Sequence, residues 1–138
     1  MRIIDNKYVI LNKTCFYPRG GGQEPDFGTI NDCKVYDGEK IDGVIIHFVE
    51  NINFKEGDTV KGIVDWDRRI QLTQHHTATH IINAAAKKVL GNHINQAGAK
   101  KTTEKAHIDI THFNSLSKDE IKAIEDEAKW LGSTLLLP

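Results

Sequence analysis

The sequence predicts an α+β fold in which a small antiparallel, β-barrel-like subdomain packs on a C-terminal two-layer α/β subdomain. The first observation behind this prediction is a series of short β-forming runs in the first half of the chain, separated by turn residues. The second is the long helix-forming run that follows them, succeeded by two more strand-like segments and another helix. We therefore expect two parts, residues 1–65 and 66–138, with no Pro- or Ser-rich linker between them.

Residues 1–65 are expected to form only strands and turns. The predicted strands are residues 7–11, 27–30, 34–36, 44–49 and 59–65. Asp37-Gly38 and Glu56-Gly57-Asp58 supply turn signals between them. Several short strands at regular spacing are typical of a small antiparallel barrel or a curled sheet.

A long helix is predicted after Asp65, because acidic residues and then an Ala-, Leu- and Lys-rich run follow. Gly91 is typical of a helix C-terminus. Whether one helix runs to Leu90 or two helices meet near Thr73 is left open by the sequence.

Two strands and a second helix are predicted in the remainder of the chain. The strands are residues 93–100 and 105–112, and in the second of these apolar and polar residues alternate. Ser117 and Glu120 have the spacing of a capping box, so the second helix begins there. Residues 133–138 could add one more strand.

Composition excludes several classes of protein. Hydrophobic residues are 39% and charged residues 27% of the 138, as in ordinary globular domains. The chain has neither an apolar run of membrane-spanning length nor a signal peptide, so we expect no membrane association and a cytoplasmic location. Two cysteines fit a reducing compartment. A net charge of −1 gives no general attraction to nucleic acid, so any RNA contact must rest on local patches.

A histidine pair on the long helix is the main candidate for chemistry. His76 and His80 are four residues apart, so their imidazoles leave the same helical face one turn apart. Two such histidines can hold two corners of a tetrahedral zinc ion. Zincin proteases carry Glu after the first histidine, and Thr77 stands there instead. The spacing alone leaves a metal site and a pair of surface or hydrogen-bonded histidines equally open.

The rest of this helix is expected to be amphipathic. The histidine face continues through Asn83 and Lys87. The opposite, apolar stripe should pack on the core, and its members are Ala78, Ile82, Ala85 and Val89.

A glycine-rich segment, Gly20-Gly21-Gly22-Gln23, lies between Pro18 and Pro25. Its backbone N–H groups could approach a ligand or an RNA backbone closely. Composition alone favours a flexible hairpin loop, and no Gly-Lys-Ser/Thr follows to make a phosphate-binding loop.

Several segments resemble the editing domain of alanyl-tRNA synthetases and the freestanding AlaX-type editing proteins, most closely those of archaea. The resemblance is carried by His76-Thr77-Ala78-Thr79-His80 and by residues 16–28, 96–101 and 105–113, in the family's order. It covers roughly residues 8–129.

The resemblance implies roles for particular residues. It places zinc at His76 and His80, and Thr14 and Gln96 in the catalytic pocket. By the same resemblance, Gly20, Gly21, Gly22 and Gln23 shape the pocket for the charged tRNA end. The basic residues that would contact the RNA backbone, or else be only solvated, are Arg68, Arg69, Lys87, Lys88, Lys100 and Lys101.

The implied activity is ATP-independent hydrolysis of the ester that joins a wrong amino acid, serine or glycine, to tRNA(Ala). A synthetase site for alanine rejects these poorly, because one hydroxyl or methyl group changes binding little. Zinc could position the aminoacyl group, activate a water or polarise the carbonyl. The alternatives are a non-catalytic tRNA-binding or accessory module, and a zinc hydrolase of small molecules.

One part of the family pattern is missing. In this family the other two zinc ligands come from a Cys-x-x-x-His pair further along the chain, whereas the last cysteine here is Cys33. The expectation is therefore a fragment or a truncated form of the editing domain. Its expected partners are the acceptor end of tRNA(Ala) and either a second copy of itself or the remainder of a synthetase.

Overall fold

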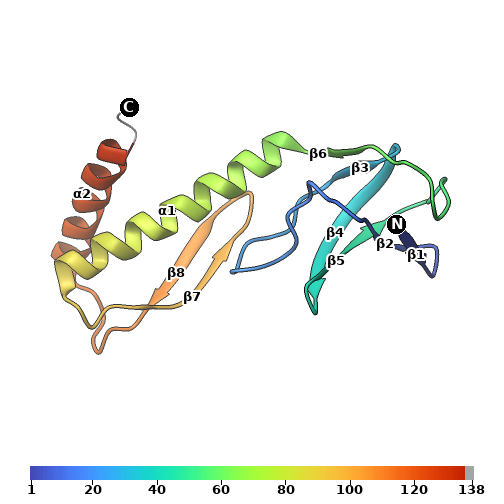
Figure 1. The fold of residues 1–138 in the computed structure, drawn as a ribbon. Helices are drawn as coiled ribbons and strands as arrows, with labels where there is room; N and C mark the ends of the chain where they lie inside the picture. Colours follow the sequence, from blue (N-terminus) through green and yellow to red (C-terminus); the bar gives the residue numbers. More distant parts are fainter. Residues whose placement is uncertain (136–138) are drawn as a thin grey trace. The chain divides into compact units, whose positions relative to one another are not determined.

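The computed structural model describes residues 1–135, without the side chain of Leu135, and confirms the α+β class. It divides into two compact units, Met1–Leu72 and Thr73–Pro138, and the long helix contains the boundary between them. The elements in chain order are β1 (Arg2–Ile4), β2 (Tyr8–Ile10), β3 (Gly28–Ile30), β4 (Cys33–Ile41), β5 (Val44–Val49), β6 (Gly62–Val64), α1 (Trp66–Leu90), β7 (Gln96–Lys101), β8 (Ala106–Ile110) and α2 (Lys118–Leu135) (Figure 1).

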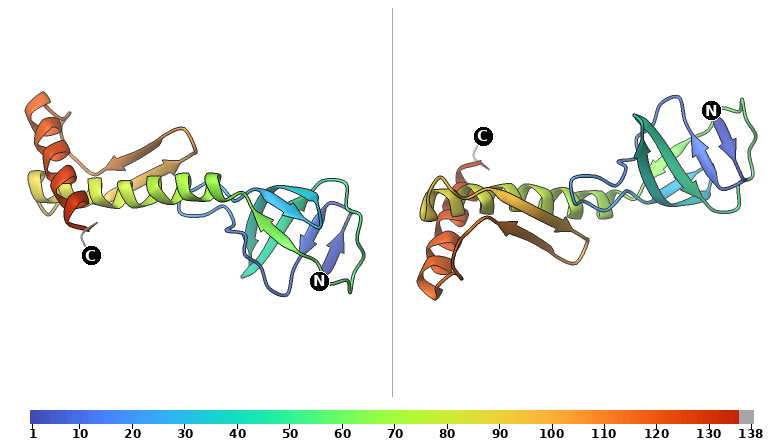
Figure 2. Two further views of the ribbon diagram at one scale, coloured as in Figure 1. Left: turned by 90° about the horizontal axis from the view of Figure 1, so that it is seen from above. Right: turned by 90° about the horizontal axis from the view of Figure 1, so that it is seen from below.

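The six strands of the first unit form one antiparallel sheet in the order β1-β2-β5-β4-β3-β6 (Figure 2). A barrel requires the first and last strands of its sheet to pair. Here β1 and β6 are the two edges and do not pair with each other in the described residues. The sheet is therefore open, and the barrel closure expected from the sequence is not found.

The turn between the two longest strands lies further along the chain than the sequence predicts. β4 continues through Asp37-Gly38, with a shift of register just before it, and ends at Ile41. Asp42 and Gly43 then form the turn, with φ angles of 48° and 84°. Two successive residues with positive φ match the right-handed twist of a hairpin, so this second Asp-Gly closes it. β5 coincides with the predicted strand at 44–49.

The other predicted strands of this unit are right in place but not in length. β2, β3 and β6 each have three residues and lie inside the predicted segments 7–11, 27–30 and 59–65. β1 was not predicted, because it is a three-residue edge strand defined mainly by its pairing with β2. Strand length here depends on pairing partners that local composition does not reveal.

A fully buried histidine lies in the sheet of the first unit, whose core is Val9, Phe16, Ile30, Cys33, Val35, Val49 and Phe54. His47 on β5 is 0% exposed, and its ring meets the Phe16 ring edge-on at 5.5 Å between centroids. Its Nδ1 lies 2.9 Å from the Val9 carbonyl oxygen and its Nε2 lies 2.7 Å from Thr14 Oγ1. Burial lowers the pKa of His47, and the bond to the Val9 carbonyl opposes this only in part.

A buried carboxylate ties the beginning of α1 to the loop before β3. Asp26 is 1% exposed and accepts a hydrogen bond from the Tyr17 backbone N–H at 2.6 Å. The Arg69 guanidinium forms an ion pair with the same carboxylate and donates to the Cys15 carbonyl at 2.8 Å. Because removing one partner leaves the other charge without its counterion, this pair constrains both segments.

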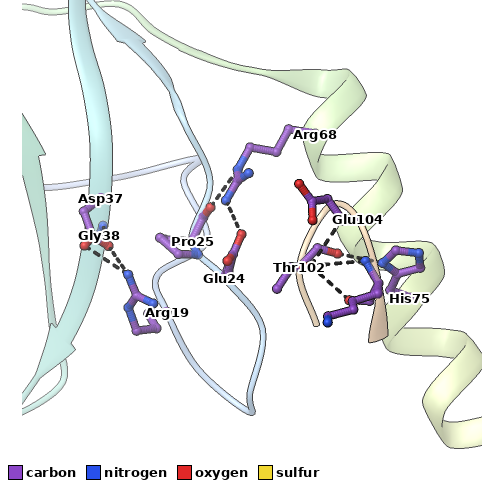
Figure 3. Close-up of polar contacts among 10 residues, drawn as sticks. Arg19, Glu24, Pro25, Asp37, Gly38, Arg68, His75, Thr102 and Glu104 are labelled. Atoms are coloured by element: carbon purple, nitrogen blue, oxygen red, sulfur yellow. Dashed lines mark hydrogen bonds and ion pairs between the residues drawn. The ribbon is translucent and has the colours of Figure 1, made fainter. Parts of the chain in front are cut away.

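Arg68 makes a second set of contacts to the same loop (Figure 3). Its Nη2 donates to Glu24 at 2.9 Å and its Nε donates to the Pro25 carbonyl at 3.2 Å. The guanidinium also lies 3.8 Å from the centroid of the Phe27 ring, which favours a stacked cation. The first turn of α1 is therefore held to the loop by two adjacent arginines.

The second unit consists of the β7–β8 hairpin, α2 and the part of α1 from Thr73 onward. Its core contains Ala85, Ala86, Ile94 and Ile124. The predicted capping box is confirmed, because the Glu120 backbone N–H donates to Ser117 Oγ at 3.2 Å and the Ser117 N–H donates to the Glu120 carboxylate at 2.8 Å. The predicted alternation on β8 is also confirmed, with His107 and Asp109 exposed.

α1 is a single helix, which settles the question that the sequence left open. Asp65 caps its beginning, because Asp65 Oδ1 accepts from the Arg68 backbone N–H at 3.1 Å. Gly91 ends it with a φ of 114°, as predicted. Within this helix and α2, the described residues contain no stretch both long and apolar enough to cross a bilayer.

The buried stripe of α1 agrees with the predicted one in part, because Ala85 is fully buried and Val89 packs against the core of the second unit. Its fully buried positions include Leu72, Thr79 and Ala86, which recur every seven residues, whereas Ile82 of the predicted stripe is 38% exposed. Thr79 can be buried because its hydroxyl donates to the His76 carbonyl at 2.7 Å. Thr79 is therefore part of the buried face, although its hydroxyl makes it a polar residue in the sequence.

The chain end also departs from the prediction of a strand at 133–138. α2 continues through these residues as far as Leu135. The Ser133 hydroxyl donates to the Trp130 carbonyl and the Thr134 hydroxyl to the Leu131 carbonyl, both at 2.8 Å and both three residues back. Residues 136–138 lie outside the described residues.

We expect Asp26→Ala to lower the free energy of unfolding by about 3 kcal/mol, because Arg69 and the Tyr17 N–H lose a buried acceptor. Arg19→Ala is the control, since it breaks only the ion pair with Asp37, in which the Arg19 side chain is 52% exposed. We expect it to cost less than about 1 kcal/mol. Urea unfolding measures both, and equal losses would contradict the assignment.

The buried His47 predicts that stability falls in mild acid. The folded protein resists protonation of His47, whereas the unfolded chain takes up the proton near the ordinary pKa of 6.5. The unfolded state therefore binds more protons below this pH, so the free energy of unfolding should decrease from about pH 7 to about pH 5. His47→Gln should flatten this slope, and His107→Gln, which removes an exposed histidine, should keep it. Parallel curves for the wild type and His47→Gln would refute the prediction.

Candidate functional site

The two histidines predicted to bind metal lie together on α1. His76 and His80 are one turn apart, with 3.1 Å between their Nε2 atoms and 4.9 Å between ring centroids. His80 is exposed and His76 is half-buried. Burial lowers the pKa of His76, and the positive charges of Lys101 and His80 act in the same direction. Both Nε2 atoms thus converge on one point beside the helix.

This geometry fits two ligands of a zinc ion. Tetrahedral zinc with bonds of about 2.0–2.1 Å holds two nitrogen ligands about 3.3 Å apart. The observed separation of the two Nε2 atoms, 3.1 Å, is close to that value. Among the described residues there is no group of three or more His, Cys, Asp or Glu side chains that could hold a metal. The pair therefore fits half of a zinc site.

The neighbouring histidine anchors this part of α1 to the β7–β8 hairpin. His75 Nδ1 lies 2.7 Å from the Thr102 carbonyl oxygen in the turn of that hairpin (Figure 3). The turn is itself closed by the Thr102 hydroxyl, which accepts from the backbone N–H groups of Glu104 and Lys105 at 3.2 and 3.1 Å. The helical turn that carries His76 is consequently fixed in place from within the second unit.

The other predicted residues of the second unit lie on the strand β7. Gln96 begins the strand and is exposed, next to a bulge between Gln96 and Gly98. Lys100 is exposed opposite His107, whereas Lys101 is only 2% exposed. Lys101 is thus not a surface contact, and the roles of Gln96 and Lys100 stay predictions.

A second histidine pair was not singled out from the sequence. His93 Nε2 lies 2.9 Å from His112 Nδ1, with the rings stacked at 5.2 Å between centroids. The Phe113 ring contacts both histidine rings, with 5.3 Å between its centroid and that of His93 and 4.7 Å to that of His112. Phe113 itself is 79% exposed. No spacing rule predicts this pair, because its members come from the loop after α1 and the segment after β8.

One hollow of the second unit is apolar. It has a volume of about 390 Å³ and its lining contains no histidine; the lining residues are Ile82, Ala86, Ile108, Ile110, Leu116, Ile121, Ile124, Glu125, Ala128 and Lys129. A smaller hollow of about 270 Å³ includes His80 and Thr77. The paired histidines on α1 therefore lie outside the apolar hollow.

In the first unit, the predicted residue Thr14 is exposed at a polar hollow of about 310 Å³. Asn12, Lys13, Asp58 and Thr59 also line the hollow. Thr14 Oγ1 contacts the buried His47, a residue that the sequence analysis did not select. The available signal was a histidine in the otherwise apolar strand 44–49.

The glycine-rich segment forms a tight turn. The Gly20 and Gln23 backbones exchange hydrogen bonds at 3.2 and 2.9 Å, and Gly21 and Gly22 have φ angles of 57° and 74°. Positive φ at both central residues is the geometry of a two-residue hairpin turn. The N–H groups of Gly20 and Gln23 are thus bonded within the turn, and the role of this segment in a pocket stays a prediction.

The predicted RNA-contacting arginines have partners inside the protein. Arg68 is bonded to Glu24 and Pro25, and its side chain is 12% exposed. Arg69 is paired with Asp26, and its side chain is 26% exposed. If either arginine contacted RNA, its guanidinium would have to bond the RNA and these protein partners at the same time, or release the protein partners.

Comparison with known proteins assigns the chain to a family. A family model described as tRNA synthetases class II (A) matches residues 1–68. The alanine–tRNA ligase of Methanococcus maripaludis is 52% identical over 126 residues, covering 91% of this chain and 14% of that protein. Those of Metallosphaera sedula and Saccharolobus islandicus are 50% and 51% identical over 127 and 129 residues, each covering 88% of this chain and 14% of the relative.

The chain spans about 14% of the length of the curated relatives it matches. Identity near one half along most of this chain is too high for a chance match, and it agrees with the archaeal resemblance of the histidine and glycine segments. The chain belongs to the alanyl-tRNA synthetase family and is similar to its archaeal members.

Proposed function

We propose that this chain is a tRNA-editing hydrolase, which cleaves the ester joining serine, or glycine, to the 3′ end of tRNA(Ala). The observation that carries the proposal is the pair of Nε2 atoms, 3.1 Å apart, on one face of α1. Its membership of the alanyl-tRNA synthetase family supports tRNA(Ala) as the substrate carrier. Such a protein would act in the cytoplasm on the acceptor end of the tRNA, as a part of a synthetase or as a self-associating unit.

An editing reaction meets a need that follows from the size of alanine. A binding site for a methyl side chain discriminates weakly against glycine, which lacks it, and against serine, which adds one hydroxyl. A second site that hydrolyses the wrong ester can supply the missing selectivity. The proposed reaction is therefore release of serine or glycine, with alanine spared.

His76 and His80 would hold two corners of a zinc ion, with the other ligands supplied from outside the described residues. When bound, zinc supplies a Lewis acid that can polarise an ester carbonyl or favour deprotonation of water. The protein's own residues orient the substrate. The Gln96 amide is exposed on β7 and can bond a seryl hydroxyl or the terminal ribose, and the Thr14 hydroxyl can bond a polar group of the aminoacyl moiety.

A non-catalytic tRNA-binding module is the second candidate. The observation in its favour is that the histidine pair supplies only half of a zinc ligand set within the described residues. A site with two protein ligands holds zinc weakly, because affinity rises with each deprotonated ligand. Binding of tRNA without turnover would distinguish this module from the enzyme.

The test is deacylation of Ser-tRNA(Ala), with Ala-tRNA(Ala) as the substrate control and zinc supplied. We expect selective serine release, and a loss of about 10- to 100-fold or more in His76→Ala and His80→Ala. His93→Ala is the matched control, since it removes an exposed histidine from the other pair, and it should keep the wild-type rate.

Three outcomes would overturn the proposal. Equal rates in His76→Ala and the wild type would exclude the pair from the reaction. Binding of tRNA to the protein without hydrolysis of the ester would favour the non-catalytic module. Hydrolysis of a small ester such as serine methyl ester, with no preference for the tRNA-linked form, would favour a small-molecule hydrolase.

A further inference from the structure

The bonding of His47 determines where its ring carries a proton. Nδ1 lies 2.9 Å from the Val9 carbonyl oxygen, and a carbonyl can only accept a hydrogen bond. Nδ1 must therefore donate. The ring is fully buried and its pKa is lowered by that burial, so it is neutral at physiological pH and Nε2 carries no proton.

This tautomer in turn fixes the direction of the Thr14 hydroxyl. Thr14 Oγ1 lies 2.7 Å from His47 Nε2, which can only accept, so the threonine donates its single hydroxyl proton to the ring. The Phe16 backbone N–H donates to Thr14 Oγ1 at 3.1 Å and occupies one oxygen lone pair. The hydroxyl is left with no proton to offer and with one free lone pair.

The arrangement is rigid because the same residues hold both ends of it. Phe16 bonds Thr14 through its backbone and packs its own ring edge-on against the His47 ring at 5.5 Å. His47 lies in the middle of β5, paired with Val9 on one side and Gly38 on the other. Thr14 itself is exposed at the polar hollow of about 310 Å³.

From this chain of hydrogen bonds we propose that His47 is a positioning residue that makes the Thr14 hydroxyl an obligate hydrogen-bond acceptor toward a ligand. The identity of that ligand rests on the function proposed above. A seryl side chain carries a hydroxyl donor that this oxygen can accept, whereas a glycyl or alanyl side chain carries none. His47 thus contributes to selection of serine without touching it.

A double-mutant cycle tests whether His47 acts through Thr14. The readout is the ratio of kcat/KM for Ser-tRNA(Ala) over Gly-tRNA(Ala). Thr14→Val removes the hydroxyl at nearly constant volume. His47→Asn keeps a donor near the Nδ1 position and removes the Nε2 acceptor, whereas His47→Gln places an amide oxygen near the Nε2 position.

We expect Thr14→Val and His47→Asn each to lower the ratio by about 2- to 10-fold, the worth of one hydrogen bond. The double variant should lose no more than either single variant, and His47→Gln should recover part of the ratio. If His47 has only a structural role, the losses in the ratio from Thr14→Val and His47→Asn should multiply in the double variant. The ratios of His47→Asn and His47→Gln should then fall in step with their thermal stability. Multiplying losses, or an unchanged ratio in a folded His47→Asn, would overturn the proposal.

A measurement on the wild-type protein separates this proposal from the proposed function. ¹⁵N NMR of the His47 ring should show a protonated Nδ1 and a bare Nε2 at neutral pH. A protonated Nε2 would overturn the proposal whether or not the chain hydrolyses any ester. Absence of hydrolysis together with the expected tautomer would exclude the proposed function. Binding of L-serinamide and of glycinamide to the wild type and to Thr14→Val would then test the selectivity. The same preference for L-serinamide in both proteins would overturn the proposal.

Discussion

The buried Asp26 carboxylate is the constraint on which the first unit depends. It takes a backbone N–H from the loop at Tyr17 and the guanidinium of Arg69 from α1, so that loop and helix share one acceptor. A carboxylate at 1% exposure is tolerable only with such partners. Arg68 and Arg69, which the sequence predicts as RNA contacts, are therefore the residues that attach the helix to this loop.

His47 and the paired histidines on α1 occupy two different environments, one buried and one accessible to ligands, and these environments suit different roles. His47 is enclosed and bonded through both ring nitrogens, so it can only direct its neighbour Thr14. His76 and His80 bring their Nε2 atoms to a common point at the edge of α1, where a ligand can reach them. The helical spacing of four brings His76 and His80 together, whereas the role of His47 comes from contacts between residues far apart in the chain.

The sequence correctly predicted the features that depend on interactions between neighbouring residues. The helix start after Asp65, the Ser117 cap, the Gly91 stop and the strand at 44–49 were right because each depends on neighbouring residues. The misplaced Asp37-Gly38 turn, the open sheet and the buried Thr79 depend on pairing and packing across the chain. For the same reason the spacing of His76 and His80 was readable from sequence, while the bonds of Thr14 and the arginines were not.

Zinc binding to the purified chain tests the central claim, that His76 and His80 form half of a metal site. Isothermal titration with zinc should show one site per chain, weakened strongly and equally by His76→Ala and His80→Ala, because both imidazoles converge on one point. His93→Ala should bind as the wild type does. Unchanged affinity in His76→Ala and His80→Ala would contradict the claim and leave the histidine face of α1 as an ordinary surface.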